Sequence, residues 1–220
     1  MISSSEKNRP GRPPFIFVGD HPAIDFANTH SISHGHRVDH FRVWADVIEW
    51  LSLSGVSTDP ALRIPASRSQ EAVKSVVKLR QAWKTELDKI VAGGKVGDDF
   101  IQQLNQLLAE DVFHETLHRS ARNGFHLDRS AAQLCGEQLA LAALSRQIAH
   151  FLAEAYLGYL RRCANTTSCV LFFYDTTKNH RRQWCSTAIC GNRHKVAEFR
   201  KRQLESNEDK SDGTEAVPPC

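Results

Sequence analysis

No run of apolar residues in this sequence approaches the roughly 20 that a membrane-spanning helix needs. The first 15 residues, MISSSEKNRPGRPPF, lack the apolar core of a signal peptide. There is no G-x-S-x-G motif and no glycine-rich phosphate loop, so neither of these catalytic site types is indicated. These absences favour a cytoplasmic protein without a membrane partner that is not an enzyme. In such a reducing compartment structural disulfides are rare.

The charge of the chain is distributed unevenly. Its 220 residues are 41% hydrophobic and 24% charged, which is ordinary for a globular protein that buries its own core. The net charge is only +3, but residues 161–202 hold ten lysines and arginines against two acids, a net charge of +8. Residues 203–220 carry five acids and one lysine, a net charge of −4. The positive charge therefore coincides with a cluster of cysteines.

The first and last segments have the composition of tails. Residues 1–14 are rich in serine, proline and charge, and predict a flexible tail. Their RPGRPP stretch resembles the core of an AT-hook, but Pro10 interrupts that pattern, which favours disorder over a minor-groove contact. Residues 204–220 are acidic and predict a second disordered tail.

The intervening sequence predicts a mainly α fold with one or two β-hairpins. Residues 15–160 form the first domain, with a strand-like apolar run at 15–18 and a hairpin signal at Asn123-Gly124. We find no internal repeat. Apolar residues recur at helical spacing in four segments, which are residues 40–55, 67–94, 98–111 and 131–160. The last of these helices leads directly into Cys163.

Four of the six cysteines fall within 28 residues as Cys163-x5-Cys169 and Cys185-x4-Cys190. A disulfide, a reactive thiol and a metal site are all conceivable for such a cluster. A reducing compartment favours a metal site over a disulfide. A segment of roughly 40 residues also has too small a core to fold without a cross-link such as a bound metal ion. Four unligated cysteines are the alternative. Cys135 lies inside an apolar helical pattern, where burial makes a thiol inert.

The segment between the two cysteine pairs has the pattern of a treble-clef zinc finger. VLFFYD predicts a strand, QWC predicts a short return strand, and a helix follows Cys190. Zn²⁺ takes four tetrahedral ligands, and each of two short loops can supply two of them. Either Ser186 or Asn192 can cap the helix. The sequence therefore predicts a C-terminal treble-clef-like zinc finger over residues 161–203.

Several motifs resemble a known family. CGNR, which begins at Cys190, together with FYDTTKN, WCS and the first cysteine pair, resembles the CGNR zinc finger. PAIDFANT near the N-terminus is similar to the LDFxNT signature of the ABATE domain. The resemblance implies a bacterial stress-induced transcription regulator with an α-rich sensor-like domain joined to a zinc finger. Thr187 departs from the family, which usually has methionine there. The resemblance implies one structural Zn²⁺ bound by Cys163, Cys169, Cys185 and Cys190.

The basic residues around the finger are candidates for nucleic-acid binding. On the last helix Ile189, Val196 and Phe199 share one stripe, which we expect to dock on the body with charge on either side. Arg193 has an alternative role, hydrogen bonding to carbonyl groups around the zinc. Trp184 is expected to pack rather than stack on a base. The predicted phosphate contacts are Arg181, Arg182, Arg193, Lys195, Arg200, Lys201 and Arg202.

Two further groups of polar residues stand out. Asp25, Asn28 and Thr29 are polar positions in an apolar setting. They predict either a small-molecule effector pocket or caps and buried hydrogen bonds. The histidines of HSISHGHRVDH, between His30 and His40, are expected to lie in a solvated loop rather than in a second metal site.

The predicted function is a zinc-containing, DNA-binding transcription regulator with a small-molecule effector. Two alternatives remain, a zinc-stabilised ligand-binding or protein-interaction module that does not bind nucleic acid, and an RNA-binding protein. The oligomeric state is left open.

Overall fold

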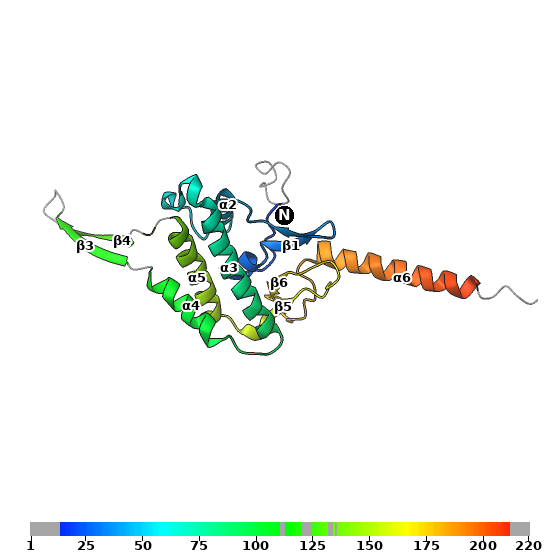
Figure 1. Cartoon of the computed structure of the whole chain (residues 1–220). Helices are drawn as coiled ribbons and strands as arrows, with labels where there is room; N and C mark the ends of the chain where they lie inside the picture. Colours follow the sequence, from blue (N-terminus) through cyan, green and yellow to red (C-terminus); the bar gives the residue numbers. More distant parts are fainter. Residues whose placement is uncertain (1–13, 111–112, 120–124, 132–133, 135, 212–220) are drawn as a thin grey trace, which may run out of the picture.

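The computed structural model describes residues 14–110, 113–119, 125–131, 134 and 136–211. Figure 1 shows an α-helical body from which a β-hairpin projects at one end and a long helix at the other. The helices of the body are α1 (Pro22–Ala27), α2 (Trp44–Leu53), α3 (Ala66–Val91), α4 (Asp98–Ala109) and α5 (Gly136–Glu154). The α-rich fold expected from the sequence is confirmed. No helix in the described part of the chain is both long and apolar enough to cross a membrane.

The core forms around α3, which packs against α1, α2 and α5. The apolar stripe of α3 predicted by its spacing is buried, and Trp83 at its centre is fully enclosed. The Trp83 ring stacks on Phe100 of α4, and its indole N–H donates to the carbonyl of Ala23 at 2.8 Å. Each large apolar side chain buried in this way stabilises the fold by about 1.5–3 kcal/mol.

Within the described residues, three antiparallel strand pairs accompany the helices. Strand β1 (His30–Ser33) pairs with β2 (His36–Asp39), β3 (Phe113–Arg119) pairs with β4 (Phe125–Ala131), and β5 (Leu160–Arg162) pairs with β6 (Phe172–Tyr174). The predicted Asn123-Gly124 turn lies outside the described residues, between β3 and β4. The β1–β2 hairpin was missed in the His-rich run. His34 and Gly35 turn it, with φ angles of 50° and 82°.

Residues 14–19 form no strand and belong to none of the described sheets, which corrects the strand expected at 15–18. Phe15 is buried in the main core, whereas Ile16 and Val18 pack against the cysteine cluster. This segment therefore bridges the body and the finger. Its side chains pack against two different cores.

The connection into the finger also differs from the prediction. Helix α5 ends at Glu154, and a single helical turn, Leu157–Tyr159, leads into β5 before Cys163. Strand β6 pairs with β5, and no strand forms at QWC. Instead, the amide of Ala164 donates to the carbonyl of Gln183 at 2.9 Å and closes the finger there. Cys135 lies outside the described residues.

The last helix, α6 (Asn192–Ser211), departs furthest from expectation. It extends beyond residue 203, where a tail was predicted, because the sequence has no glycine or proline between Gly191 and Gly213. It also projects away from the body (Figure 1). The prediction that the apolar stripe of this helix docks on the body is therefore wrong, since Ile189, Val196 and Phe199 are 50%, 49% and 56% exposed.

Candidate metal centre and basic surface

The four predicted ligands come together in one buried cluster. Cys163 follows β5 and Cys169 precedes β6. Cys185 precedes the helical turn Thr187–Gly191, and Cys190 lies within it. Their four sulfur atoms lie within 4.8 Å of one another, and all four residues are buried. The structure thus joins two loops, separated by fifteen residues in sequence, as the spacing predicted.

The sulfur positions fit a tetrahedral metal and exclude a disulfide between the measured pairs. The Sγ atom of Cys185 lies 3.7 Å from that of Cys169 and 3.6 Å from that of Cys190. A disulfide would require about 2.05 Å, and the four cysteines are free. Four sulfurs at about 2.3 Å from a zinc ion are separated by about 3.8 Å when arranged tetrahedrally. The cluster therefore fits one structural zinc.

Local hydrogen bonds shape both ligand loops. In the first loop the hydroxyl groups of Thr167 and Ser168 donate to the side-chain oxygen of Asn165 at 3.2 and 3.0 Å. In the second loop the hydroxyl of Ser186 accepts from the amide of Ile189, as predicted for the cap. The carbonyl of Ser186 accepts from the amide of Cys190 at 2.9 Å. These turns direct the sulfurs inward.

Hydrogen bonding also favours the thiolate form at one ligand. The amide of Cys185 donates to the sulfur of Cys163 at 3.5 Å. Hydrogen bonds from the three neighbouring cysteines, reinforced by this amide, lower the pKa of the Cys163 thiol. A zinc ion would supply Lewis-acid charge that keeps all four ligands deprotonated. Four cysteine ligands leave no open coordination position, so the site is structural.

Asp175, which sequence reasoning missed, organises the turn between the two ligand loops. Its carboxylate is fully buried and accepts from the amide and hydroxyl of Thr177, at 3.0 and 2.6 Å, and from the amide of Arg182 at 2.9 Å. Burial alone would raise the pKa of Asp175, but these hydrogen bonds outweigh it and hold the pKa below its usual value. The turn ends at His180, whose ring stacks on Tyr159.

Arg182 lies inside the junction rather than on a binding surface. Its guanidinium group donates to the carboxylate of Asp20 and to the carbonyl oxygens of Cys185 and Val18. It also lies over the ring of Phe173, 4.5 Å from the centroid. These contacts occupy the group that a phosphate would need, so Arg182 is removed from the predicted DNA contacts. Its role is to tie the finger to the N-terminal segment.

The three predicted effector residues also lie in this junction. Asn28 is fully buried and pairs with the backbone of Phe172 in β6, accepting from its amide and donating to its carbonyl, both at 2.9 Å. Thr29 donates to the carbonyl of Phe26 and accepts from Arg80. Asp25 accepts from the amides of Val18 and Gly19 at 3.0 and 2.7 Å.

These partners give Asp25, Asn28 and Thr29 a structural role instead of the expected pocket. Burial raises the pKa of Asp25 to about 6, against the two backbone hydrogen bonds that lower it. Gly19 is required beside it, because a Cβ atom there would lie 2.9 Å from the Asp25 carboxylate oxygen and 2.8 Å from Ile24. Of the two predictions made for these polar residues, the structure therefore favours buried hydrogen bonds over an effector pocket.

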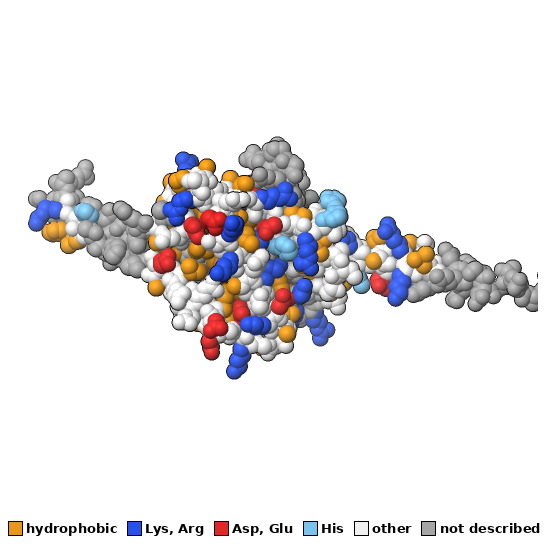
Figure 2. Space-filling view, viewed as in Figure 1, with side chains coloured by type: hydrophobic (Ala, Val, Ile, Leu, Met, Phe, Trp, Pro, Cys, Tyr) orange, Lys and Arg blue, Asp and Glu red, His pale blue; other side chains and the backbone are white. Residues whose placement is uncertain are grey.

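The other basic residues remain at the surface. Arg181 is exposed on the finger loop, and Arg193, Lys195, Arg200, Lys201 and Arg202 are exposed on α6. Figure 2 shows lysine and arginine side chains on the described part of the projecting helix, whereas on this face of the body basic and acidic side chains are mixed. Trp184 is partly buried against the cysteine cluster, as expected for packing.

The histidine run supplies no second metal site within the described part of the chain. There the cysteines form the one group of metal-ligating side chains close enough to hold an ion. His40 is buried and its ring bonds the hydroxyl of Ser31 at 2.8 Å. At the end of the run the partly exposed Asp39 accepts from the buried Arg80, a pair that the sequence did not suggest.

These features define a class of protein, an α-rich domain carrying a four-cysteine zinc finger. Residues 159–203 match the CGNR zinc finger family. Residues 20–155, more than half of the chain, match the ABATE family, described as "Putative stress-induced transcription regulator". The chain therefore belongs to the ABATE family, which confirms the resemblance drawn from the motifs. No curated protein matches it.

Proposed function

We propose that this protein is a DNA-binding transcription regulator in which the finger and α6 contact DNA and the N-terminal domain senses an effector. The proposal that α6 contacts DNA rests mainly on one observation. Between Asn192 and Leu204 the projecting helix holds five basic residues and one acid, Glu198, and all of these are exposed. A helix free of the body with this charge can lie along or within a groove of DNA.

The basic residues lie on two sides of α6. Arg193 and Arg200 are seven residues apart and therefore share one side, while Lys195 and Arg202 share the other. Phosphates of both strands line a groove, so basic residues on two sides of one helix fit that arrangement. Arg181 adds a further contact from the finger loop. Lys201 completes the proposed set, which no longer includes Arg182.

The test is fluorescence anisotropy of labelled duplex DNA at several salt concentrations. Six phosphate contacts give a slope of log affinity against log salt of about −5 to −6. Arg200→Ala is expected to weaken binding to all duplexes and to reduce the slope by about one. Arg68→Ala, which removes an exposed arginine at the start of α3, is the matched control. An unchanged slope in the Arg200 variant would refute the assignment of that contact.

A second function is favoured by the exposed apolar residues of α6. Val196, Phe199 and Leu204 are 49%, 56% and 65% exposed, which is unusual for a helix that only displays charge. They suit an interaction with another protein. If neither duplex DNA nor RNA binds at low salt, while the zinc content stays at one equivalent, the result favours a protein-interaction module over a DNA-binding regulator. Preference for RNA in the same assay selects the RNA-binding alternative.

A further inference from the structure

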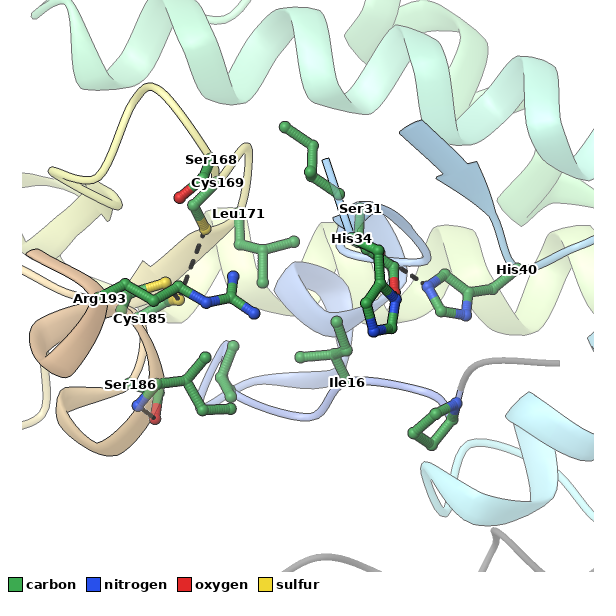
Figure 3. A pocket seen from close by; sticks show the side chains of 16 residues that line it. Ile16, Ser31, His34, His40, Ser168, Cys169, Leu171, Cys185, Ser186 and Arg193 are labelled. Carbon is green, nitrogen blue, oxygen red and sulfur yellow. Dashed lines mark hydrogen bonds between the residues drawn. The ribbon is translucent and has the colours of Figure 1, made fainter. Parts of the chain in front are cut away.

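A cavity of about 280 Å³ lies where the N-terminal segment, the β1–β2 hairpin and the finger meet. Figure 3 shows it between the cysteine cluster on one side and His34 and His40 on the other. Its volume is close to the lower limit of small-molecule pockets, which is about 300 Å³. It is distinct from the buried positions of Asp25, Asn28 and Thr29, none of which lines it.

The walls of the cavity are mainly apolar. Ile16 and Val18 line it from the N-terminal segment, and Leu171 and Ile189 line it from the finger. Ile189 is half exposed, so a guest molecule would cover apolar surface that the protein itself leaves in contact with water. An apolar body of limited size is therefore the first property of a suitable ligand.

The charge of the cavity gives the second property. Arg193 is the one lysine or arginine among the lining residues, and none of them is aspartate or glutamate. In Figure 3 its side chain extends away from Cys185, and the guanidinium group lies toward Leu171 and Ile16. Arg193 makes no ion pair with any residue that the structure describes. An anionic group on the ligand would supply the missing partner.

The zinc centre constrains where that anion can lie. Four thiolates around a divalent ion carry a net charge of −2, which repels an anion at short range. The orientation of Arg193 reduces this conflict, because its guanidinium group lies between the labelled cysteines and Ile16, beside Leu171 (Figure 3), and so separates the thiolates from an anion bound on the Ile16 side. An anion there meets the arginine first, while the apolar body fills the space over Ile16 and Leu171.

We infer that this cavity binds a small organic monocarboxylate with an aromatic or branched apolar body. The inference rests on the sensing part of the proposed function and gives it a place at the junction of body and finger. Such a ligand contacts both parts at once, and it pairs with Arg193, a residue proposed to contact DNA. Binding of the ligand and binding of DNA therefore compete for the same guanidinium group.

The experiment uses the full-length, zinc-loaded protein and isothermal titration calorimetry. The probes are benzoate, phenylacetate and isovalerate, with benzamide as the neutral analogue and acetate as the anion without an apolar body. At least one of the three probes is expected to bind saturably at one site per chain. Benzamide and acetate are expected to bind at least tenfold more weakly, because each lacks one of the two properties.

Two variants test the site itself. Arg193→Gln is expected to weaken carboxylate binding about tenfold and to leave benzamide unchanged. Ile16→Trp, which fills the cavity, is expected to abolish binding of every probe. Arg68→Gln is the charge-matched control, and each variant is used only if its zinc content and unfolding temperature match those of the wild type.

The inference is overturned if none of the three carboxylates binds at millimolar concentration. It is also overturned if binding survives both Arg193→Gln and Ile16→Trp. Duplex binding without any probe is measured separately and reports only on the proposed function. If the protein binds benzoate but no duplex, the carboxylate site is supported and the DNA-binding function is refuted. If it binds duplex DNA but none of the carboxylates, the DNA-binding function is supported and the carboxylate site is refuted.

Discussion

Replacing Asn28 with alanine is expected to loosen the attachment of the finger to the body. The Asn28 amide makes two hydrogen bonds to the backbone of Phe172, both 2.9 Å long and both fully buried. Alanine leaves the amide and the carbonyl of Phe172 without these partners. A buried polar group that loses its partner costs about 1–3 kcal/mol, so the two together cost about 2–6 kcal/mol in unfolding free energy.

The assay is urea unfolding of the zinc-loaded protein, supported by thermal melting. A loss of about 3 kcal/mol corresponds to a decrease of about 6–12 °C in Tm for a chain of this size. Asn105→Ala is the control, because Asn105 is exposed within α4 and its replacement should change the free energy of unfolding by less than about 0.5 kcal/mol. If the Asn28 and Asn105 variants unfold alike, the buried pair does not hold the junction.

Two further predictions concern the zinc centre and pH. Cys185→Ser is expected to lower bound zinc from one equivalent per chain to well below half, measured by elemental analysis, with Cys220→Ser retaining zinc; full retention by the Cys185 variant contradicts the ligand assignment. Asp25 has its pKa raised to about 6, so the folded state binds this proton more tightly than the unfolded state. Its stabilising effect is complete below the unfolded pKa near 3.9 and is lost as pH rises through 6. Between pH 7 and pH 5 the wild type should therefore gain about 1 kcal/mol relative to Asp25→Asn, and a constant difference in unfolding free energy would refute this.

The sequence predicted the features that depend on short-range patterns. The stripe of α3 and the two cysteine pairs are local signals, and both were confirmed. The β1–β2 hairpin escaped because its turn uses His34 with φ of 50°, a conformation that non-glycine residues seldom adopt. The projection of α6 away from the body was not predicted, because an apolar stripe on a helix does not reveal whether a surface exists for it to dock on.

The functional assignment of polar residues failed where the partner lies far away in sequence. Asn28 meets Phe172 across 144 residues, and Arg182 meets Val18 across 164. Neither pairing leaves a local signal, so both residues looked available for ligands when they were already bound within the protein. Arg193 was identified as a basic residue, but the cavity beside it could not be foreseen, because its walls come from three separate segments.

The N-terminal motif PAIDFANT contacts strand β6 of the finger, so the finger is not an independent attachment. Asn28 of PAIDFANT bonds β6, and the amide of Tyr174, within FYDTTKN, donates to the carbonyl of Gly19 at 2.9 Å. Leu160 and Phe172 also belong to the main core of the body. Because the body and the finger share this core, zinc removal cannot unfold residues 163–191 without exposing part of it. Chelation should therefore destabilise the N-terminal domain as well, and the same mechanical connection would transmit an event in the junction to α6.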